Sequence, residues 1–399
     1  MRFRLGINYW PITSAMRWWQ RFDAGEVERD FALIRAAGFD SVRLFLLWED
    51  FQPAPDEVAA PALANLVRVA DSAKQHQLQL VPTLFTGHMS GANWAPAWAI
   101  ASGESSARQR FRVVSGGRVL NARLTNWYTD ARIMEAQANL ARAVAAALGE
   151  HPALWAYDLG NENSNCVVPP SRAAASAWLE TMAGAIRSVD TIHPITIGLH
   201  MEDLEEDRGL TPAEAAQVCD FLCMHGYPLY ADWARDATDE LALVFLGLIT
   251  RWLGGKAVLF EEFGAPTRPR DNRRAEQLAR QCKVTLLDEE TAAQFTRRAL
   301  AALRHFGFTG AMLWCFGDYS EAIWDEPPLD EALHERFFGL WRSDHSPKPA
   351  LVEINEMSGA EQCERADDFA WIDVAREEFY QHPRANLRRL YQSFLRRLD

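Results

Sequence analysis

Short runs of apolar, β-branched and aromatic residues alternate along the chain with longer segments whose apolar residues recur every three to four positions. Each short run predicts a buried strand, and each longer segment predicts an amphipathic helix. In the first helix Val27, Phe31 and Ile34 share one face, and Asp23 and Glu26 have the spacing of a capping box. The predicted strands are residues 5–10, 41–48, 78–85, 153–160, 195–199, 221–225, 257–261 and 310–316. The main helices between them are predicted at 23–38, 61–76, 133–148, 171–189, from 212 onward, at 238–253 and at 289–304.

This alternation of strands and helices is the pattern of a parallel sheet with helical crossovers. Eight strands at an average spacing of about 40 residues fit a (β/α)₈ TIM barrel. Two connections are long, residues 86–128 after the third strand and 264–287 after the seventh. A doubly wound sheet is the alternative, but no GxGxxG motif follows an early strand.

We therefore expect residues 1–355 to form a (β/α)₈ catalytic barrel. The remaining residues, 356–399, are predicted to be a short C-terminal helical extension packed on the barrel. Its amphipathic helix lies near 384–397, where Leu387, Leu390 and Phe394 have helical spacing.

Composition and charge disfavour several other classes of protein. The chain has 399 residues, of which 48% are hydrophobic and 24% charged, a balance typical of globular proteins. Its net charge of −13 disfavours binding to nucleic acid or to an anionic membrane. The N-terminus has no apolar stretch typical of a secretory signal, and the six cysteines are irregularly spaced. We therefore expect free thiols and a cytoplasmic location.

The predicted strand ends are rich in residues that carry chemistry, and in (β/α)₈ barrels the catalytic groups lie at the C-terminal ends of the strands. Glu162 follows the fourth strand and Glu262 the seventh, a pair of carboxylates suited to cleavage of a glycosidic bond. Arg43 on the second strand would keep a nearby carboxylate ionised. Candidate sugar-binding residues at the strand ends are Trp10, Arg43, Trp48, His88, Asn161, His225, Tyr227, Trp314 and Asp318.

The tryptophans, the arginine-rich stretch and the absence of known motifs add less about function. A flat indole such as Trp314 can pack against a pyranose ring, although core packing accounts for most of the 15 tryptophans. The arginine-rich stretch at 268–283 predicts a solvated, mobile loop. The sequence has no HxH, HExxH, EF-hand, GxSxG or Walker motif, so we expect no metal and no cofactor.

Taken together, these motifs resemble glycoside hydrolase family 5, in the clan of retaining (β/α)₈ glycosidases, over roughly residues 5–350. The resemblance is carried by Asn161-Glu162, His225-Gly226-Tyr227, Glu262-Phe263-Gly264, Trp314 and the upstream Arg43. It implies that Glu162 is the acid/base and Glu262 the nucleophile. It also implies that Arg43, His225, Tyr227 and Trp314 bind and orient the substrate.

Glu261 departs from the family pattern, which usually has a small residue at this position. Strand alternation predicts that its side chain points away from that of Glu262. We therefore expect Glu261 to have a role outside the catalytic pair.

The predicted function is a retaining β-glycosidase acting by double displacement, with its two carboxyl groups about 5 Å apart. An oligosaccharide is the expected substrate, and among members of the family an exo-acting β-mannosidase is the most similar. Endo-β-mannanase and β-glucosidase or cellulase-type hydrolase remain alternatives, as does a transglycosylase with the same residues. A catalytically silent sugar-binding barrel would be expected to have lost one acid, and both are present. The sequence predicts no oligomeric state.

Overall fold

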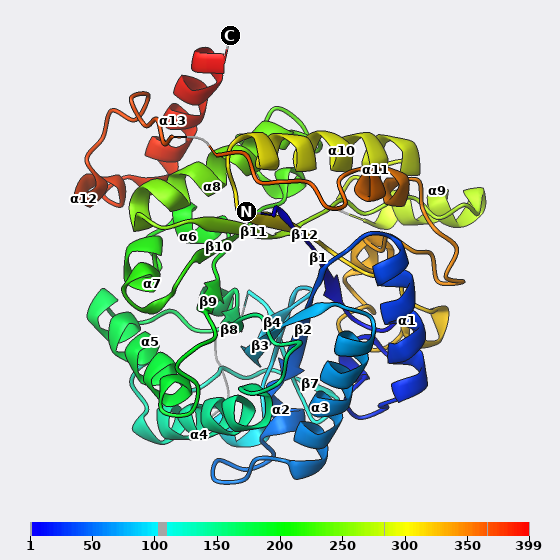
Figure 1. Ribbon diagram of the computed structural model, residues 1–399, viewed down its shortest axis with the longest axis vertical. Helices are drawn as coiled ribbons and strands as arrows, with labels where there is room; N and C mark the ends of the chain where they lie inside the picture. Colours follow the sequence, from blue (N-terminus) through cyan, green and yellow to red (C-terminus); the bar gives the residue numbers. More distant parts are fainter. Residues whose placement is uncertain (1, 103–109, 283, 365, 399) are drawn as a thin grey trace.

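Eight parallel strands form the centre of the computed structural model, which describes residues 2–102, 110–282, 284–364 and 366–398 (Figure 1). Their order is β10-β11-β12-β1-β2-β3-β8-β9. A bridge between His200 and His225 brings the two ends of this order together, so the sheet is a nearly closed barrel. The strands are β1 (Arg4–Tyr9), β2 (Ser41–Leu47), β3 (Gln79–Thr86), β8 (Tyr157–Asn161), β9 (Ile195–Gly198), β10 (Leu222–His225), β11 (Val258–Phe263) and β12 (Gly310–Leu313).

The helices between these strands surround the barrel and bury one apolar face against it (Figure 1). They are α1 (Ala24–Ala36), α3 (Ala60–Gln75), α4 (Ala131–Leu148), α5 (Arg172–Arg187), α7 (Pro212–Val218), α8 (Glu240–Gly254) and α10 (Glu289–His305). Local sequence sets their ends: Asp130 caps α4 by accepting a hydrogen bond from the Ile133 amide, and α8 ends at Gly255, whose φ of 67° is left-handed. The (β/α)₈ prediction is therefore confirmed.

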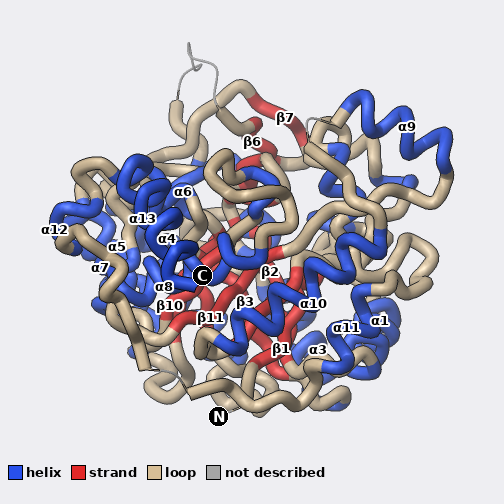
Figure 2. The backbone as a smooth tube through the Cα atoms, turned by 90° about the horizontal axis from the view of Figure 1, so that it is seen from above, coloured by secondary structure: helices blue, strands red, loops and turns tan. Residues whose placement is uncertain are grey.

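The long connection after β3 forms a small sheet of its own. Its strands are β4 (His88–Met89), β5 (Ala92–Trp94), β6 (Arg112–Ser115) and β7 (Arg118–Leu120), and part of the connection, residues 103–109, lies outside the described residues. Figure 2 shows β6 and β7 at one end of the barrel, with the N-terminus at the other. Because β4 follows the carboxyl end of β3, this sheet covers the end where catalytic groups are expected.

The basic stretch at 268–283 is largely helical, so its prediction as a loop is wrong. Residues Asn272–Gln281 form α9, and Asp271 caps it by accepting a hydrogen bond from the Arg273 amide. Residue 283 lies outside the described residues. The prediction rested on the charge of the stretch, whereas the cap at Asp271 allows a helix to start there.

The C-terminal segment lies on the outside of the helical ring. It contains the short helix α12 (Arg376–Phe379) and the longer α13 (Pro383–Leu398), which packs on α8 and on α6 (Glu202–Glu205). The predicted apolar face is buried, with Leu387, Leu390 and Phe394 all 2% exposed or less. None of the helices in the described part of the chain combines the length and apolar character needed to cross a membrane.

Candidate active site

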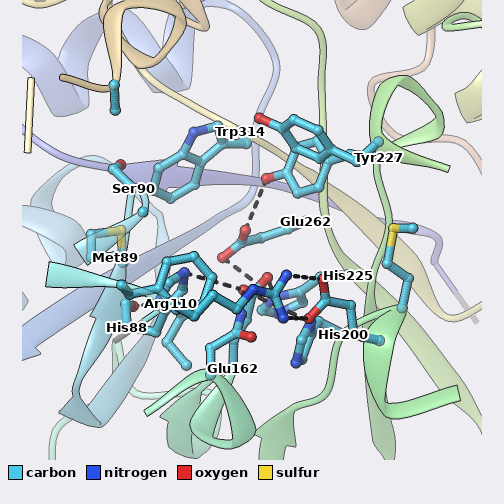
Figure 3. Close-up of a pocket in the computed structure, with 18 of the residues that line it drawn as sticks. His88, Met89, Ser90, Arg110, Glu162, His200, His225, Tyr227, Glu262 and Trp314 are labelled. Carbon is cyan, nitrogen blue, oxygen red and sulfur yellow. Dashed lines mark hydrogen bonds and ion pairs between the residues drawn. The ribbon is translucent and has the colours of Figure 1, made fainter. Parts of the chain in front are cut away.

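A cavity of about 600 Å³ opens at the carboxyl ends of the barrel strands (Figure 3). This volume lies within the range of about 300–1,000 Å³ that is common for small-molecule sites. The structure brings together at this cavity most of the side chains predicted from the strand ends. Those that line it are His88, Asn161, Glu162, His225, Tyr227, Glu262 and Trp314.

Glu162 follows β8 in a strained backbone conformation. Its φ of 48° and ψ of 47° are left-handed, which is uncommon for a residue other than glycine and concentrates at functional sites. The Glu162 amide donates to the carbonyl of Gly198 on β9 at 3.1 Å, and the carboxylate accepts from Asn165 Nδ2 at 3.0 Å. The sharp turn after β8 therefore directs the Glu162 side chain into the cavity.

Glu262 lies near the end of β11 and is held by two donors. Arg43 Nη1 donates to its Oε1 at 2.5 Å, and Tyr227 Oη donates to its Oε2 at 2.9 Å. Arg43 is fully buried and also donates to Asp158 and to Asn161 Oδ1. This network fixes the position of Glu262 and places a permanent positive charge beside it.

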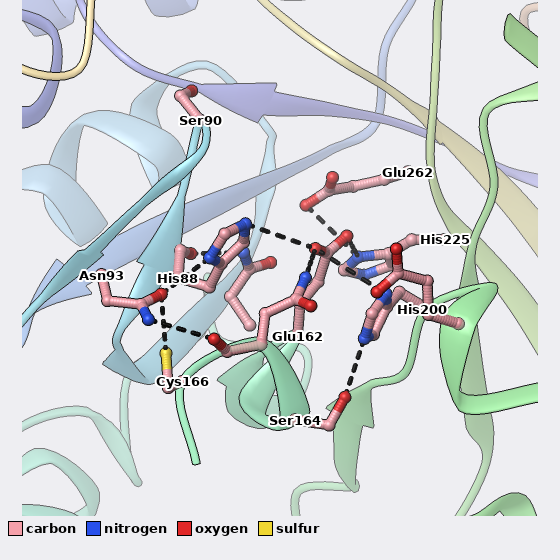
Figure 4. Close-up of polar contacts among 12 residues, drawn as sticks. His88, Ser90, Asn93, Glu162, Ser164, Cys166, His200, His225 and Glu262 are labelled. Atoms are coloured by element: carbon pink, nitrogen blue, oxygen red, sulfur yellow. Dashed lines mark hydrogen bonds and ion pairs between the residues drawn. The ribbon is translucent and has the colours of Figure 1, made fainter. Parts of the chain in front are cut away.

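His225 connects the two glutamates. Its Nδ1 lies 3.2 Å from Glu162 Oε1 and 3.6 Å from Glu262 Oε1 (Figure 4). One ligand atom from each of these three residues lies within 4.8 Å of the others. The two carboxylates therefore face each other across a short gap.

Glu261 also points into the barrel, contrary to the prediction from strand alternation. Its Oε2 is 3.2 Å from His225 Nε2, and its Oε1 is 3.4 Å from Arg43 Nε. The register of β11 shifts against both neighbouring strands between Phe260 and Phe263, and such an irregularity breaks the alternation of side chains. Glu261 is fully buried and does not line the cavity.

The charges of the site are strongly coupled. Burial opposes a charge on His225, but the carboxylates of Glu262, Glu162 and Glu261 outweigh it and raise the pKa of His225 to about 10. Burial and the charge of Glu162 raise the pKa of Glu262. For Glu162 burial acts in the same direction, but the surrounding imidazoles, first that of His200, outweigh it and hold the pKa of Glu162 low.

This order of pKa values is the reverse of the one expected for an acid at Glu162 and an ionised nucleophile at Glu262. The cause is the group of three imidazoles, from His88, His200 and His225, around Glu162 (Figure 4). The raised pKa of His225 favours its protonated form at neutral pH, and its Nδ1 lies 3.2 Å from Glu162 Oε1.

By distance alone, Glu162, His225 and Glu262 could also hold a metal ion. A protonated imidazole cannot be a ligand, and the raised pKa of His225 favours the protonated form at neutral pH. Glu262 is in addition already paired with Arg43. We therefore interpret the three residues as an acid–base group.

Four predicted binding residues do not line the cavity. One is Arg43, which is fully buried and binds Glu262 and Asn161 instead of reaching the cavity surface. The other three lie elsewhere in the packing. Trp10 is fully buried and stacks on a phenylalanine of β2, with the ring centroids 5.0 Å apart. Trp48 is 1% exposed and its Nε1 donates to Gln52 Oε1 at 2.8 Å. Asp318 accepts a hydrogen bond from Lys348 Nζ at 2.7 Å, and neither residue lines the cavity. These contacts give the three residues roles in packing rather than in sugar contact, which corrects the prediction.

Several lining residues were not among the predicted site residues. Ser90, Phe111, His200 and Glu335 lie in or beside connections, where no hydrophobic periodicity marks a position as facing the site. Of these residues, His200 could have been predicted from the sequence, because it follows the fifth predicted strand and strand ends face the site. Arg384 from α13 also reaches the cavity, so the C-terminal extension contributes to its lining.

Fold and site together define a (β/α)₈ barrel with paired glutamates at the ends of its fourth and seventh strands, the arrangement in which the sequence resembles glycoside hydrolase family 5. No protein-family model matches the sequence. The chain is 23% identical to mannan endo-1,4-β-mannosidase A of Hypocrea jecorina over 294 residues, which are 67% of this chain and 62% of that protein. It is 24% identical over 350 residues to putative mannan endo-1,4-β-mannosidase 5 of Oryza sativa subsp. japonica, covering 77% of this chain and 65% of that one.

The structure is also similar to solved structures. An exo-β-1,4-mannosidase from Opitutaceae bacterium strain TAV5 is 27% identical, with a TM-score of 0.72 over 90% of this chain and 60% of that one. A GH5_18 protein from Streptomyces cattleya, in complex with Manβ1-4GlcNAc, is 21% identical with a TM-score of 0.76, over 99% and 91% of the two chains, and shows a shared fold.

These comparisons confirm the resemblance to family 5. The chain spans less than two thirds of the length of the two mannan endo-1,4-β-mannosidases and of the Opitutaceae mannosidase.

Proposed function

We propose that the protein is a retaining, exo-acting β-mannosidase that releases mannose from the non-reducing end of β-linked oligosaccharides. The observation that carries the proposal is the pairing of Glu162 and Glu262, whose nearest carboxylate oxygens lie within 4.8 Å of each other. Retaining glycosidases have carboxyl groups about 5–5.5 Å apart, whereas inverting enzymes need about 6.5–9.5 Å to admit a water molecule. The short gap therefore favours double displacement.

In the first step, a carboxylate oxygen of Glu262 attacks the anomeric carbon while Glu162 donates a proton to the departing glycosidic oxygen. Arg43 and Tyr227 hold Glu262 in place and stabilise its ionised form. In the second step, Glu162 removes a proton from water, the water oxygen bonds to the anomeric carbon, and the bond to Glu262 breaks. His225 Nδ1, 3.2 Å from Glu162 Oε1, supplies the proton that Glu162 donates in the first step and takes back the proton that Glu162 removes from water in the second.

Exo action is supported by a wall on the side of the cavity away from Glu162. The leaving group must lie beside the acid, at the β8 side of the barrel. On the opposite side the loops after β3 and β12 are tied together, because both Arg112 guanidinium nitrogens bind Asp330, at 2.6 and 2.9 Å, and Ser90 Oγ donates to Glu335 at 3.1 Å. Exo action requires a wall of this kind, because it limits how far the substrate can extend beyond the scissile bond.

The preference for mannose rests on the relatives. The similar proteins named above are mannosidases and mannanases, and the Streptomyces cattleya structure contains Manβ1-4GlcNAc. Asn161 lines the cavity next to Glu162 and can contact the sugar there. Its amide nitrogen donates one N–H to the His88 carbonyl, and the second N–H can donate to a sugar hydroxyl group. We therefore propose both manno-oligosaccharides and Manβ1-4GlcNAc as substrates to be tested.

The test is hydrolysis of 4-nitrophenyl β-mannoside and β-glucoside, followed by product analysis on mannohexaose and Manβ1-4GlcNAc. We expect faster turnover of the mannoside, release of mannose one unit at a time, and β-mannose as the first anomer seen by proton NMR. Internal cleavage, or α-mannose as the first product, would contradict the exo or the retaining assignment. Products longer than the substrate would identify a transglycosylase, and binding without turnover a sugar-binding barrel.

Variants separate the roles of the two glutamates. Glu162→Gln and Glu262→Gln should each abolish turnover of the disaccharide, whereas Glu180→Gln, at an exposed position on α5, should not. With azide present, Glu262→Ala should form α-mannosyl azide and Glu162→Ala should form the β-anomer from an activated aryl mannoside. The opposite anomers would exchange the two assignments.

A further inference from the structure

Glu335 is a buried carboxylate in the wall of the cavity that the mechanism above does not use. It lies in the 3-10 helix Leu333–Phe337 after β12 and is 9% exposed. Its Oε2 accepts hydrogen bonds from Trp314 Nε1 at 3.2 Å and from Ser90 Oγ at 3.1 Å. The two donors come from the end of β12 and from the connection after β3, so Glu335 lies where the two parts of the wall meet.

The described residues offer this carboxylate no arginine or lysine as a partner within ion-pair distance. The ion-pair neighbour found for it is His334, whose Nε2 is 3.5 Å from Glu335 Oε1. Burial lowers the pKa of His334 to about 4, so this imidazole is neutral at pH 7, and burial raises the pKa of Glu335 to about 7. A buried carboxylate without a cation is unfavourable unless hydrogen-bond donors satisfy it. Glu335 therefore has acceptor capacity that the protein itself leaves partly unused.

The position of Glu335 in the cavity places it near the edge of the sugar ring that lies opposite the anomeric carbon. In Figure 3 Trp314 and Ser90 lie on one side of Glu262, and Glu162 lies on the other. Glu162 has to be next to the leaving group, so a sugar whose anomeric carbon meets Glu262 directs the opposite edge of its ring toward Trp314 and Ser90. Carbon 4 is the ring atom across from the anomeric carbon. In a β-1,4-linked chain, only the terminal sugar has a free hydroxyl group on that carbon.

We propose that Glu335 accepts a hydrogen bond from the free 4-hydroxyl group of the terminal sugar and is thereby the residue that selects the chain end. The proposal rests on the glycosidase function proposed above and deepens it. Trp314 and Ser90 hold the carboxylate in place, and the sugar hydroxyl completes its hydrogen bonding. An internal sugar, substituted at oxygen 4, has no proton to donate there and leaves one acceptor position of the buried carboxylate unfilled, so it is rejected.

The test compares 4-nitrophenyl β-mannoside with its 4-deoxy analogue in the wild-type protein and in Glu335→Gln. The assay is run at about pH 8.5, above the Glu335 pKa of about 7, so that the carboxylate is charged. A hydrogen bond to a charged group contributes enough that the wild type should then lose about 10- to 100-fold in kcat/KM on the 4-deoxy substrate. In Glu335→Gln and in Glu335→Ala this ratio should fall to about 3-fold or less. The ratio is taken within each variant, so it does not depend on how much of a variant is folded.

The matched control is Glu331→Gln, in the same loop, because the Glu331 side chain is 71% exposed and away from the cavity lining. It should keep the wild-type ratio. A purely structural role for Glu335 would lower kcat/KM on both substrates equally and leave the ratio unchanged, which would overturn the proposal.

Failure of the proposal can be told apart from failure of the proposed function. If the wild type cleaves the β-glucoside and not the β-mannoside, only the sugar assignment is wrong, and the 4-deoxy comparison is made on the glucoside. If the wild type cleaves a substrate but its ratio equals that of Glu335→Gln, the role of Glu335 is wrong and the glycosidase function stands. If no glycoside is cleaved, both are wrong.

Discussion

The pKa of His225 provides a direct test of how the buried charges of the site are arranged. His225 lies among three carboxylates, and Glu261 is the one that lies below the cavity, out of reach of a substrate. Burial alone would lower the pKa of His225, and the carboxylates instead raise it to about 10. We predict that Glu261→Gln, which removes one of these charges and nearly keeps the shape of the side chain, lowers that pKa.

The size of the shift follows from the geometry. His225 Nε2 and Glu261 Oε2 are 3.2 Å apart. Two unit charges at this distance attract each other by about 5 kcal/mol at an effective dielectric constant of about 20. One pKa unit corresponds to about 1.4 kcal/mol, so the upper limit of the shift is about 4 units. The amide oxygen of glutamine still accepts a hydrogen bond, and we therefore expect a fall of about 2 units.

The raised pKa of His225 also determines how the stability of the fold changes with pH. A raised pKa in the folded state means that the proton on His225 stabilises the fold below the ordinary pKa of histidine, and that this contribution is lost as the pH rises through the folded-state value. In the wild type the loss occurs as the pH approaches about 10. In Glu261→Gln the same loss should begin about 2 pH units lower.

The assay is NMR titration of the protein labelled with ¹⁵N in its histidine rings, with His225→Gln to assign the signal. Glu180→Gln, at an exposed position on α5, is the control and should leave the titration unchanged. An unchanged His225 titration in Glu261→Gln would refute the inferred charge arrangement. Glu261→Gln should also keep measurable turnover, and if it abolishes turnover while Glu262→Gln does not, the nucleophile has been misassigned.

Three further predictions follow from single contacts. Tyr227→Phe removes a donor to the nucleophile, at 2.9 Å, and should lower kcat/KM by about 10- to 150-fold, and a loss below 2-fold would contradict that role. Lys348→Met leaves the buried carboxylate of Asp318 without its cation and should lower the free energy of unfolding in urea by about 3–5 kcal/mol. The exposed Lys74→Met is its control, and equal effects of the two would show that the buried pair is not special. Arg112→Ala breaks the contact that ties the wall together and should release mannobiose as well as mannose from mannohexaose, whereas mannose alone would show that this contact does not close the cavity.

Local patterns in the sequence were enough to predict the barrel. Strand and helix positions depend on hydrophobic period and on caps such as Asp130, which act over a few residues. Because parallel strands in a barrel all end at the same face, knowing the strand ends also brought Glu162 and Glu262 together without any knowledge of distances. The same rule placed His225 and Tyr227 at the site.

The same rule wrongly assigned some strand-end residues to the site. A side chain near the end of a strand can point either into the cavity or into the layer of helices. Trp10 and Trp48 are packed against neighbouring aromatic and amide groups, and only the twist and register of the sheet determine this. The register shift in β11 likewise directs Glu261 and Glu262 into the same interior, where strict alternation would have separated them.

The sequence by itself determined the order of strands and helices, and with it the positions of Glu162 and Glu262, because short-range hydrophobic patterns decide both. Only the tertiary structure decided what surrounds that pair. Ser90 and Glu335 are 245 residues apart in the sequence and meet because two connections fold over the same cavity. Contacts of that kind depend on how long loops pack against each other, and neither periodicity nor residue type encodes them locally.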